Sequence, residues 1–419
     1  MNDTFLIGAA SAAHQVEGNN IHSDIYAQEY METGGYKEKS LDAADHYHTY
    51  KEDIEKMAKA GLNAYRFSIE WSRIEPEEKV FDQKEMQHYL DVIHACKQNH
   101  IEPVVTLLHF TSPKWLISKG GWEAETTPED FERYVRYVCE YLKEEDIKYI
   151  VTINEANMGT LIAGYLEKIM KHTEGSSLQI GMDLESMHAQ QQKAQEENLK
   201  VFGVNEAHVF TSPRSEHGDE IVQEAHKKAV KVIHSLLPDT KVGLSLSVRA
   251  LHALEGGEEN VEKDWYKDFL HYLPCMQEDD FFGVQTYTRA NFNKEGECDP
   301  KPGERVTQMG YAYYPECVEE VIHKVHESFK KELMVTENGI ATDDDAERCE
   351  YIKTAVSGAL KCKEEGIPVV GYMYWSMIDN YEWQSGYGMK FGLMSLDRTT
   401  QEHTPKESLY VLGSYTKNK

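Results

Sequence analysis

The strongest constraint on the fold is the regular alternation of short apolar segments with longer helical patterns. Eight segments read as β-strands because they are short and rich in β-branched and aromatic residues: 4–10, 63–69, 103–110, 149–154, 241–248, 281–287, 333–338 and 369–375. Amphipathic helical patterns lie between them, among them 45–61, 83–99, 128–145 and 344–366. Apolar strands that alternate with such helices form a parallel sheet covered by helices. Eight units predict an α/β fold, a single (β/α)₈ TIM barrel.

One region departs from this alternation. Residues 160–225 contain long polar runs that no barrel unit requires, and we interpret them as an elaborated loop region after the fourth strand. The chain has no fixed-period repeat, low-complexity tract or Pro/Ser-rich linker that would divide it. We therefore expect residues 1–419 to form one (β/α)₈ catalytic domain.

The composition narrows the set of partners. The chain carries 44 Lys and Arg against 72 Asp and Glu, and this net charge of -28 repels nucleic acid and anionic membrane surfaces. The N-terminal residues lack the basic start of a signal peptide, and no apolar run approaches the ~20 residues of a membrane span. Seven cysteines include no Cys-x-x-Cys pair. These features predict a cytoplasmic protein with reduced thiols that binds neither nucleic acid nor a membrane; the oligomeric state is left open.

Polar and aromatic residues stand at the carboxyl ends of the predicted strands, where a barrel of this kind builds its active site. The candidates are Arg66, with Trp71 beyond it, His109, Asn154, Glu155, Tyr287, Glu337, Asn338 and Trp375. Each of them alone has an ordinary explanation as a loop, core or ion-pair residue. Glutamates at two strand ends, with Arg, His, Tyr and Trp at others, are hard to explain by packing.

Two carboxylates across a small cavity are the groups that cleave a glycosidic bond. One protonates the leaving oxygen, and the other attacks or supports the anomeric carbon, so the two need different charge states. A neighbouring cation holds one carboxylate ionised, whereas burial and a negative neighbour raise the pKa of the other. We expect Arg66 to hold Glu337 ionised, Tyr287 to hydrogen-bond it, and Glu155 to be the proton donor.

Several stretches resemble the motifs of family 1 glycoside hydrolases, the group of retaining β-glucosidases and β-galactosidases. The resemblance covers nearly the whole chain in the right order, from FLIGAASAAHQVEGN through TINEAN and VTENGI to GYMYWSMIDNYEWQSGYGMKFGLMSLD. It implies that Glu155 is the acid/base and Glu337 the nucleophile of a double displacement, with Arg66 and Tyr287 supporting the nucleophile. It also implies sugar contacts from Gln15, His109, Asn154, Tyr287, Trp375, Glu382 and Trp383.

The same resemblance bears on the substrate. Members that act on 6-phosphoglycosides typically carry Ser where this chain has Glu382, and Lys and Tyr where it has Met389 and Phe391. A carboxylate repels a phosphate dianion but accepts hydrogen bonds from free sugar hydroxyls. We therefore expect a β-glucosidase-like enzyme that removes an unphosphorylated terminal sugar, although a shifted loop could offer Lys390 to a phosphate. The kind of sugar and the aglycone stay open.

The chain also departs from the family pattern around the pocket. Ile7, Phe110, Ala156, Gln285 and Thr286 stand where the family usually has other residues. These departures remove no catalytic group, but they put the aglycone preference and the fine selectivity for the sugar in doubt.

Three alternatives were weighed: a 6-phospho-β-glycosidase, a non-catalytic carbohydrate-binding barrel, and a metal-dependent barrel enzyme. The last needs a cluster of His and carboxylate residues at the rim, whereas His46 and His48 stand two residues apart, on different sides of a helix. No phosphate loop or dinucleotide motif occurs. We therefore expect no metal and no cofactor, and a small-molecule or oligosaccharide β-glycoside as the partner.

Overall fold

The structure, a computed structural model, describes residues 4–175 and 184–416. At its centre lies a parallel sheet of nine strand segments in the order β5-β4-β3-β2-β1-β12-β11-β8-β6. The segments are β1 (Leu6–Ala10), β2 (Ala64–Ser68), β3 (Glu102–Leu108), β4 (Tyr149–Ile153), β5 (Lys241–Gly243), β6 (Ser245–Ser247), β8 (Phe281–Gln285), β11 (Glu332–Asn338) and β12 (Val369–Trp375). All eight predicted strand regions therefore form strands. The ends of the predicted 1–419 domain, residues 1–3 and 417–419, lie outside the described residues.

The sheet closes into a barrel through its fifth unit. β5 pairs with β4 and β6 pairs with β8, and a single residue, Leu244, separates the two segments. β5 and β6 thus form one interrupted strand that joins the two edges of the sheet. Counted as one strand, they reduce the nine segments to the eight strands of a (β/α)₈ barrel. The prediction of a (β/α)₈ barrel is confirmed.

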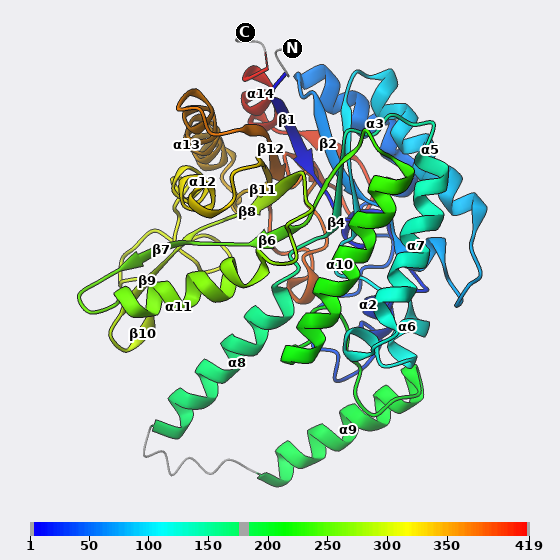
Figure 1. The fold of residues 1–419 in the computed structure, drawn as a ribbon, viewed down its shortest axis with the longest axis vertical. Coiled ribbons are helices and arrows are strands. Elements are labelled where there is room, and N and C mark those ends of the chain that lie inside the picture. Colours follow the sequence, from blue (N-terminus) through cyan, green and yellow to red (C-terminus); the bar gives the residue numbers. More distant parts are fainter. Residues whose placement is uncertain (1–3, 176–183, 417–419) are drawn as a thin grey trace.

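Helices surround the barrel (Figure 1). The principal ones are α3 (His46–Ala60), α5 (Gln83–Gln98), α7 (Thr127–Leu142), α10 (Glu216–Leu236), α12 (Cys317–Ser328), α13 (Asp345–Glu364) and α14 (Glu407–Ser414). Helix α7 buries Phe131, Tyr134, Val135, Val138 and Leu142, whose three- and four-residue spacing places them on one face. The four predicted helices are confirmed, and α5 and α13 begin after aspartates whose side chains accept backbone N–H groups.

Further helices and turns connect these elements. They are α1 (Ala13–Val16), α2 (Asp24–Gln28), α4 (Trp71–Ile74), α6 (Lys114–Ser118), α11 (Glu258–Asp268) and the 3₁₀ turns Gly121–Glu123, Leu270–Tyr272 and Trp383–Ser385. Two small sheets contain β7 (Ala250–Ala253), β9 (Arg289–Asn293) and β10 (Gly296–Cys298), and β13 (Met394–Leu396) with β14 (His403–Pro405). Each is attached to the barrel rather than part of it.

The prediction of a loop over residues 160–225 is wrong for most of the described part. Helices α8 (Met158–Gly175) and α9 (Leu184–Phe202) occupy it, and Figure 1 shows both extending beyond the barrel. The polar runs that suggested a loop are rich in Gln, Ala, Glu and Lys, which are strong helix formers. Residues 176–183 of the predicted region lie outside the described residues.

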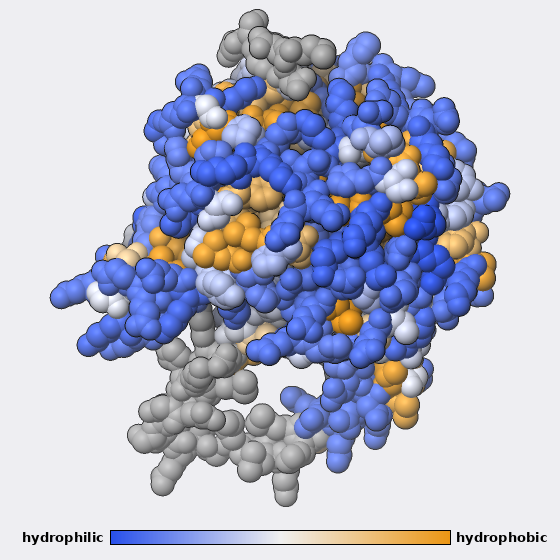
Figure 2. Space-filling view, viewed as in Figure 1, coloured by the Kyte–Doolittle hydropathy of each residue, from blue (hydrophilic) through white to orange (hydrophobic). Residues whose placement is uncertain are grey.

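The surface agrees with the acidic, polar composition. The face in Figure 2 is mostly hydrophilic, and its hydrophobic residues are confined to separate patches. Within residues 4–175 and 184–416, no helix is long and apolar enough to cross a membrane.

Candidate active site

A cavity of about 380 Å³, which we call the substrate cavity, lies at the carboxyl ends of the strands. This volume is within the range of small-molecule sites. Eight of the predicted site residues line it: Gln15, His109, Glu155, Tyr287, Glu337, Trp375, Glu382 and Trp383. They lie at or beyond the carboxyl ends of different strands, and the parallel arrangement brings those strand ends to one rim.

Glu337, near the end of β11, is held at both carboxylate oxygens. Arg66 of β2 donates from Nη1 to Oε1 at 2.6 Å, and the Tyr287 hydroxyl donates to Oε2 at 2.6 Å. The Arg66 side chain is fully buried. A buried guanidinium needs a counter-charge, and Glu337 supplies it. The predicted pairing of Arg66 and Tyr287 with Glu337 is present.

Behind the cavity wall, two amide side chains extend this network. Asn154, directly after β4, accepts from Arg66 Nη2 at 2.6 Å through Oδ1. Gln285, the last residue of β8, donates from Nε2 to the same Oδ1 at 2.6 Å and to Glu337 Oε1 at 3.0 Å. Asn154 Nδ2 lies 3.3 Å from His109 Nε2. Asn154 is therefore placed next to the cavity, in contact with a residue that lines it.

Glu155 follows Asn154 and adopts a left-handed backbone conformation, with φ of 43°. Such conformations are strained for residues other than glycine and often occur at functional sites. The backbone N–H of Glu155 donates to Ser245 Oγ at 3.2 Å. Burial, with the charge of Glu337 acting in the same direction, raises the pKa of Glu155 to about 8. The Glu155 carboxyl is thus mostly protonated at pH 7.

The environment of Glu337 acts differently on its charge. Burial leaves its pKa above the usual value for a glutamate, although the charge of Arg66 and the hydrogen bonds from Tyr287 and Gln285 lower it. All three donors stabilise the ionised form. Glu337 and Glu155 therefore differ in their surroundings. The donors around Glu337 stabilise its ionised form, and the surroundings of Glu155 stabilise its neutral form.

The remaining wall combines aromatic rings with polar groups. Trp375 stacks with His109 at 5.6 Å between ring centroids, and Trp383 stacks with His14 at 5.8 Å. Gln15 donates from Nε2 to Glu382 Oε2 at 3.2 Å. Burial and the nearby Glu337 charge raise the pKa of Glu382 to about 8.

Two polar atoms of this wall have no hydrogen-bond partner among the described residues. They are Gln15 Oε1 and His109 Nδ1, and both are buried. Burial and the Arg66 charge lower the pKa of His109 well below its usual value, so its ring is neutral. Buried polar atoms are normally satisfied, so these two mark where a bound polar molecule would be placed.

Two residues predicted at the rim lie elsewhere. Trp71 begins α4 and packs against Phe131 and Tyr134 between the helices. Asn338 turns away from the cavity, because its Nδ2 donates to Thr286 O at 2.7 Å and its Oδ1 accepts from the Tyr372 hydroxyl at 2.6 Å. The expectation that both belong to the site is wrong.

Of the three loop positions considered for binding a phosphate, one lines the substrate cavity and two do not. Phe391 lines the substrate cavity, whereas Met389 and Lys390 are not among the described residues that line it. The possibility of Lys390 as a phosphate ligand therefore gains no support from the geometry.

Gln285 is the functional-site residue that the sequence reasoning missed, because we treated it only as a departure from a family pattern. A signal was present. Residues two apart on a strand point to the same face, so Gln285 is on the face from which Tyr287 was predicted to reach Glu337.

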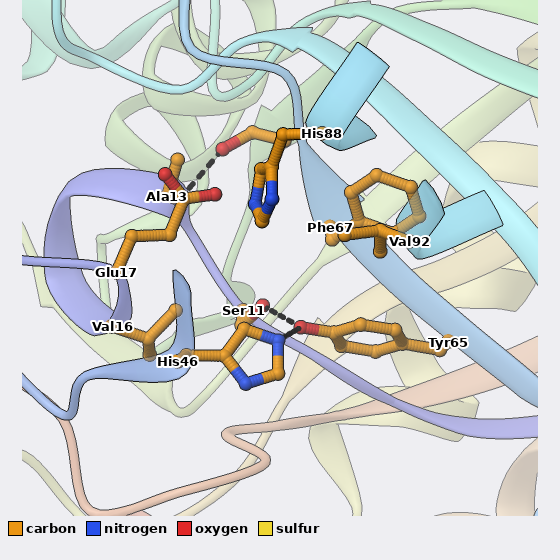
Figure 3. Close-up of a pocket in the computed structure, with 10 residues that line it drawn as sticks. Ser11, Ala13, Val16, Glu17, His46, Tyr65, Phe67, His88 and Val92 are labelled. Atoms are coloured by element: carbon orange, nitrogen blue, oxygen red, sulfur yellow. Dashed lines mark hydrogen bonds between the residues drawn. The ribbon is translucent and has the colours of Figure 1, made fainter. Parts of the chain in front are cut away.

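A second cavity, which we call the closed cavity, has a volume of only about 10 Å³ (Figure 3). Ser11 Oγ and the Tyr65 hydroxyl are 2.6 Å apart beside it, and the Tyr65 hydroxyl lies 3.0 Å from His46 Nε2. This volume has room for about one water molecule and excludes a sugar. No group of three or more His, Cys, Asp or Glu residues in the described part of the chain could hold a metal ion.

A parallel (β/α)₈ barrel with two buried glutamates at its strand ends, one of them paired with arginine, has the architecture of a barrel glycosidase. The model of glycosyl hydrolase family 1 matches residues 1–419. β-Glucosidase A of Thermotoga maritima is 30% identical over 99% of this chain and 97% of that protein. The chain therefore belongs to glycosyl hydrolase family 1, and it is a glycoside hydrolase.

Other relatives widen the range of substrates within the family. The 6-phospho-β-galactosidase of Clostridium acetobutylicum is 26% identical over 97% of this chain and 95% of that protein. The crystal structure of β-glycosidase BGL167 superimposes with a TM-score of 0.88 at 39% identity, covering 99% of this chain and 97% of that one. The relatives thus agree on the family but include both a β-glucosidase and a 6-phospho-β-galactosidase.

Proposed function

We propose that this protein is a retaining β-glycosidase that removes an unphosphorylated sugar from the non-reducing end of a β-linked glycoside. The observation that carries the proposal is the contrast between two glutamates in one cavity. Glu337 is surrounded by donors that favour its ionised form, and the pKa of Glu155 is raised to about 8. A nucleophile must be ionised and a general acid protonated, so Glu337 is assigned the first role and Glu155 the second.

The reaction then proceeds in two displacements. Glu337 attacks the anomeric carbon while Glu155 transfers its proton to the departing glycosidic oxygen, which leaves a covalent glycosyl-enzyme and an ionised Glu155. Glu155 next removes a proton from water, which attacks the same carbon and releases Glu337. Two inversions restore the β configuration. This mechanism predicts about 5 Å between the two carboxyl groups.

The remaining predicted site residues are assigned to binding of the sugar. Gln15, His109 and Glu382 would bind hydroxyl groups, because two of them have a buried polar atom without a protein partner and the third is a carboxyl group. Asn154 would donate from Nδ2. Trp375 and Trp383 would supply apolar faces against which the sugar ring packs.

The charges of the substrate cavity support an unphosphorylated sugar. Three of its lining residues are acidic: Glu155, Glu337 and Glu382. Among the described lining residues, Arg249 is the one Lys or Arg, and its guanidinium is engaged with Asp264, Asp268 and Glu297. A phosphate dianion would meet the negative charge of Glu337 in this cavity, and Arg249 is not free to offset that charge.

A panel of chromogenic β-glycosides, each with and without a 6-phosphate, tests the proposal. We expect turnover of the unphosphorylated compounds, with the first-formed sugar in the β configuration by NMR. Preference for phosphorylated compounds would instead identify a 6-phospho-β-glycosidase, and binding without turnover would identify a carbohydrate-binding barrel. A first-formed α product would contradict retention.

The cytoplasmic location and the single domain stay predictions.

A further inference from the structure

Gln285 takes part in a closed ring of four buried side chains. Its Nε2 donates to Asn154 Oδ1 at 2.6 Å and to Glu337 Oε1 at 3.0 Å. Arg66 donates to the same two oxygens, each at 2.6 Å. Each oxygen therefore receives two close donors, one from an arginine and one from an amide, and Gln285 closes the ring opposite the guanidinium.

The ring fixes the orientation of the Asn154 amide. Oδ1 accepts its two close hydrogen bonds from Arg66 and Gln285, and the Ser245 hydroxyl lies farther away, at 3.5 Å. If the amide turned over, its NH₂ group would face two other donors. Nδ2 is therefore directed to the other side, where it lies 3.3 Å from His109 Nε2. The donor that the mechanism assigns to the sugar is thus set by groups that do not touch the sugar.

The ring also distinguishes the two oxygens of Glu337. Oε1 accepts from both Arg66 and Gln285, whereas Oε2 accepts from the Tyr287 hydroxyl alone. A carboxylate oxygen has about two lone-pair positions. Oε2 therefore keeps one lone pair for the anomeric carbon, and Oε1 is the oxygen that anchors the side chain.

From this geometry we propose that Gln285 is a positioning residue, which orients the Asn154 amide toward the sugar and leaves Glu337 Oε2 as the attacking oxygen. The inference rests on the proposed function of Glu337. Gln285 is fully buried and is not among the described residues that line the substrate cavity, so it acts through its neighbours. An asparagine in its place would be shorter by one carbon–carbon bond, about 1.5 Å, and could not reach both oxygens from the same backbone.

The test is Gln285→Met, which keeps the length of the side chain and removes both donors, with Thr286→Val as the matched control. Thr286 is the next residue, is equally buried, and has no role in the ring. Losing a donor to Glu337 raises the pKa of that carboxylate. We expect the acidic limb of kcat/KM to move up by about 0.5 to 1 pH unit, and kcat/KM to fall about 10- to 100-fold. The control should keep the parental limb.

Gln285→Glu supplies the same readout in a variant of nearly unchanged volume. Its carboxylate oxygens would oppose Asn154 Oδ1 and Glu337 Oε1, so activity should be lower still at pH 7 and partly recover as the pH falls. A merely structural role would lower the unfolding temperature and leave the pH limbs in place. Parental limbs in both variants would overturn the proposal.

The Glu337→Gln variant separates failure of this proposal from failure of the proposed function. If Glu337→Gln is inactive while both Gln285 variants keep the parental acidic limb, Glu337 keeps its role and Gln285 loses its own. If Glu337→Gln is fully active, the proposed function itself fails.

Discussion

The substrate cavity and the closed cavity both keep carboxylates out of water, but they satisfy their polar groups differently. Beside the closed cavity, His46 bonds Tyr65 on one side and, through Nδ1, Asp53 Oδ2 at 2.9 Å on the other. The substrate cavity leaves Gln15 Oε1 and His109 Nδ1 without partners among the described residues, next to about 380 Å³ of space. Burial of a carboxylate alone therefore does not identify an active site. Buried polar atoms that lack a hydrogen-bond partner and lie next to a cavity of this size do point to an active site.

The charge states of the buried acids depend on their hydrogen-bond partners in both regions. Against the effect of burial, hydrogen bonds from His403 and His46 hold the pKa of Asp53 well below its usual range. Burial raises the pKa of Glu155 and Glu382 to about 8 in the substrate cavity. Histidine partners therefore stabilise the charge of Asp53, whereas burial raises the pKa of Glu17, which lines the closed cavity, to about 7. In the substrate cavity, Glu155 and Glu382 are mostly protonated at pH 7.

Replacing the nucleophile should cause the largest loss of activity. Glu337→Gln keeps the shape of the side chain but removes the attacking oxygen, so we expect kcat to fall at least about 10⁴-fold. Steady-state kinetics on a chromogenic β-glycoside measure it. A variant that turns over at the parental rate would remove Glu337 from its role, and circular dichroism would check that the fold is retained.

Removing the general acid should produce a smaller and pH-dependent loss. For Glu155→Gln we expect kcat/KM to fall about 10²- to 10⁴-fold, most for substrates with poor leaving groups. In the parent, kcat/KM should decline as the pH rises through about 8, because Glu155 loses the proton it must donate. A pH profile of the variant should lack this alkaline limb. Persistence of the limb would assign it to another group.

Changing the sugar-binding wall should affect binding more than chemistry. Glu382→Ser removes an acceptor for sugar hydroxyls, a loss of about 1.5 to 3 kcal/mol that raises KM about 10- to 150-fold. Above about pH 8, where Glu382 is ionised, the change also removes negative charge, so the ratio of kcat/KM for 6-phosphorylated over free glycosides should rise there. Paired assays on the two substrates measure this ratio. An unchanged ratio would mean that Glu382 does not exclude phosphate.

Breaking the closed cavity should affect stability and leave catalysis almost intact. Tyr65→Phe removes the hydroxyl that joins Ser11 to His46, and we expect a loss of about 1 to 3 kcal/mol in the free energy of unfolding. Because no substrate contact changes, kcat/KM should stay within about twofold. Denaturant titration and kinetics on one preparation test both parts. A large fall in kcat/KM at full stability would make the closed cavity part of the active site.

The barrel could be predicted because its signal is local. Short apolar strands and capped amphipathic helices are set by neighbouring residues, and the carboxyl ends of parallel strands meet at one rim whatever the details of packing. That is why Glu155 and Glu337 were found in advance. A prediction from neighbouring residues failed for α8 and α9. There the polar composition suggested a loop, although the residue types favour a helix.

The two misplaced rim residues show a different limit. Asn338 follows Glu337 directly, so alternation along the strand turns it to the opposite face, where it bonds Tyr351 and Tyr372. Its position could have been predicted from that alternation. Trp71 could not, because its surroundings are set by how α4 packs against α7.

The amino-acid pattern was sufficient for the order of the strands and helices, the rim on which the acids stand, and the chemistry that two such acids can perform. It could not give the ring around Asn154 and Glu337. Arg66 and Glu337 are 271 residues apart, and Gln285 meets Asn154 across 131 residues. Which lone pair each donor occupies depends on distances of a few tenths of an ångström, and only the packed barrel fixes those distances.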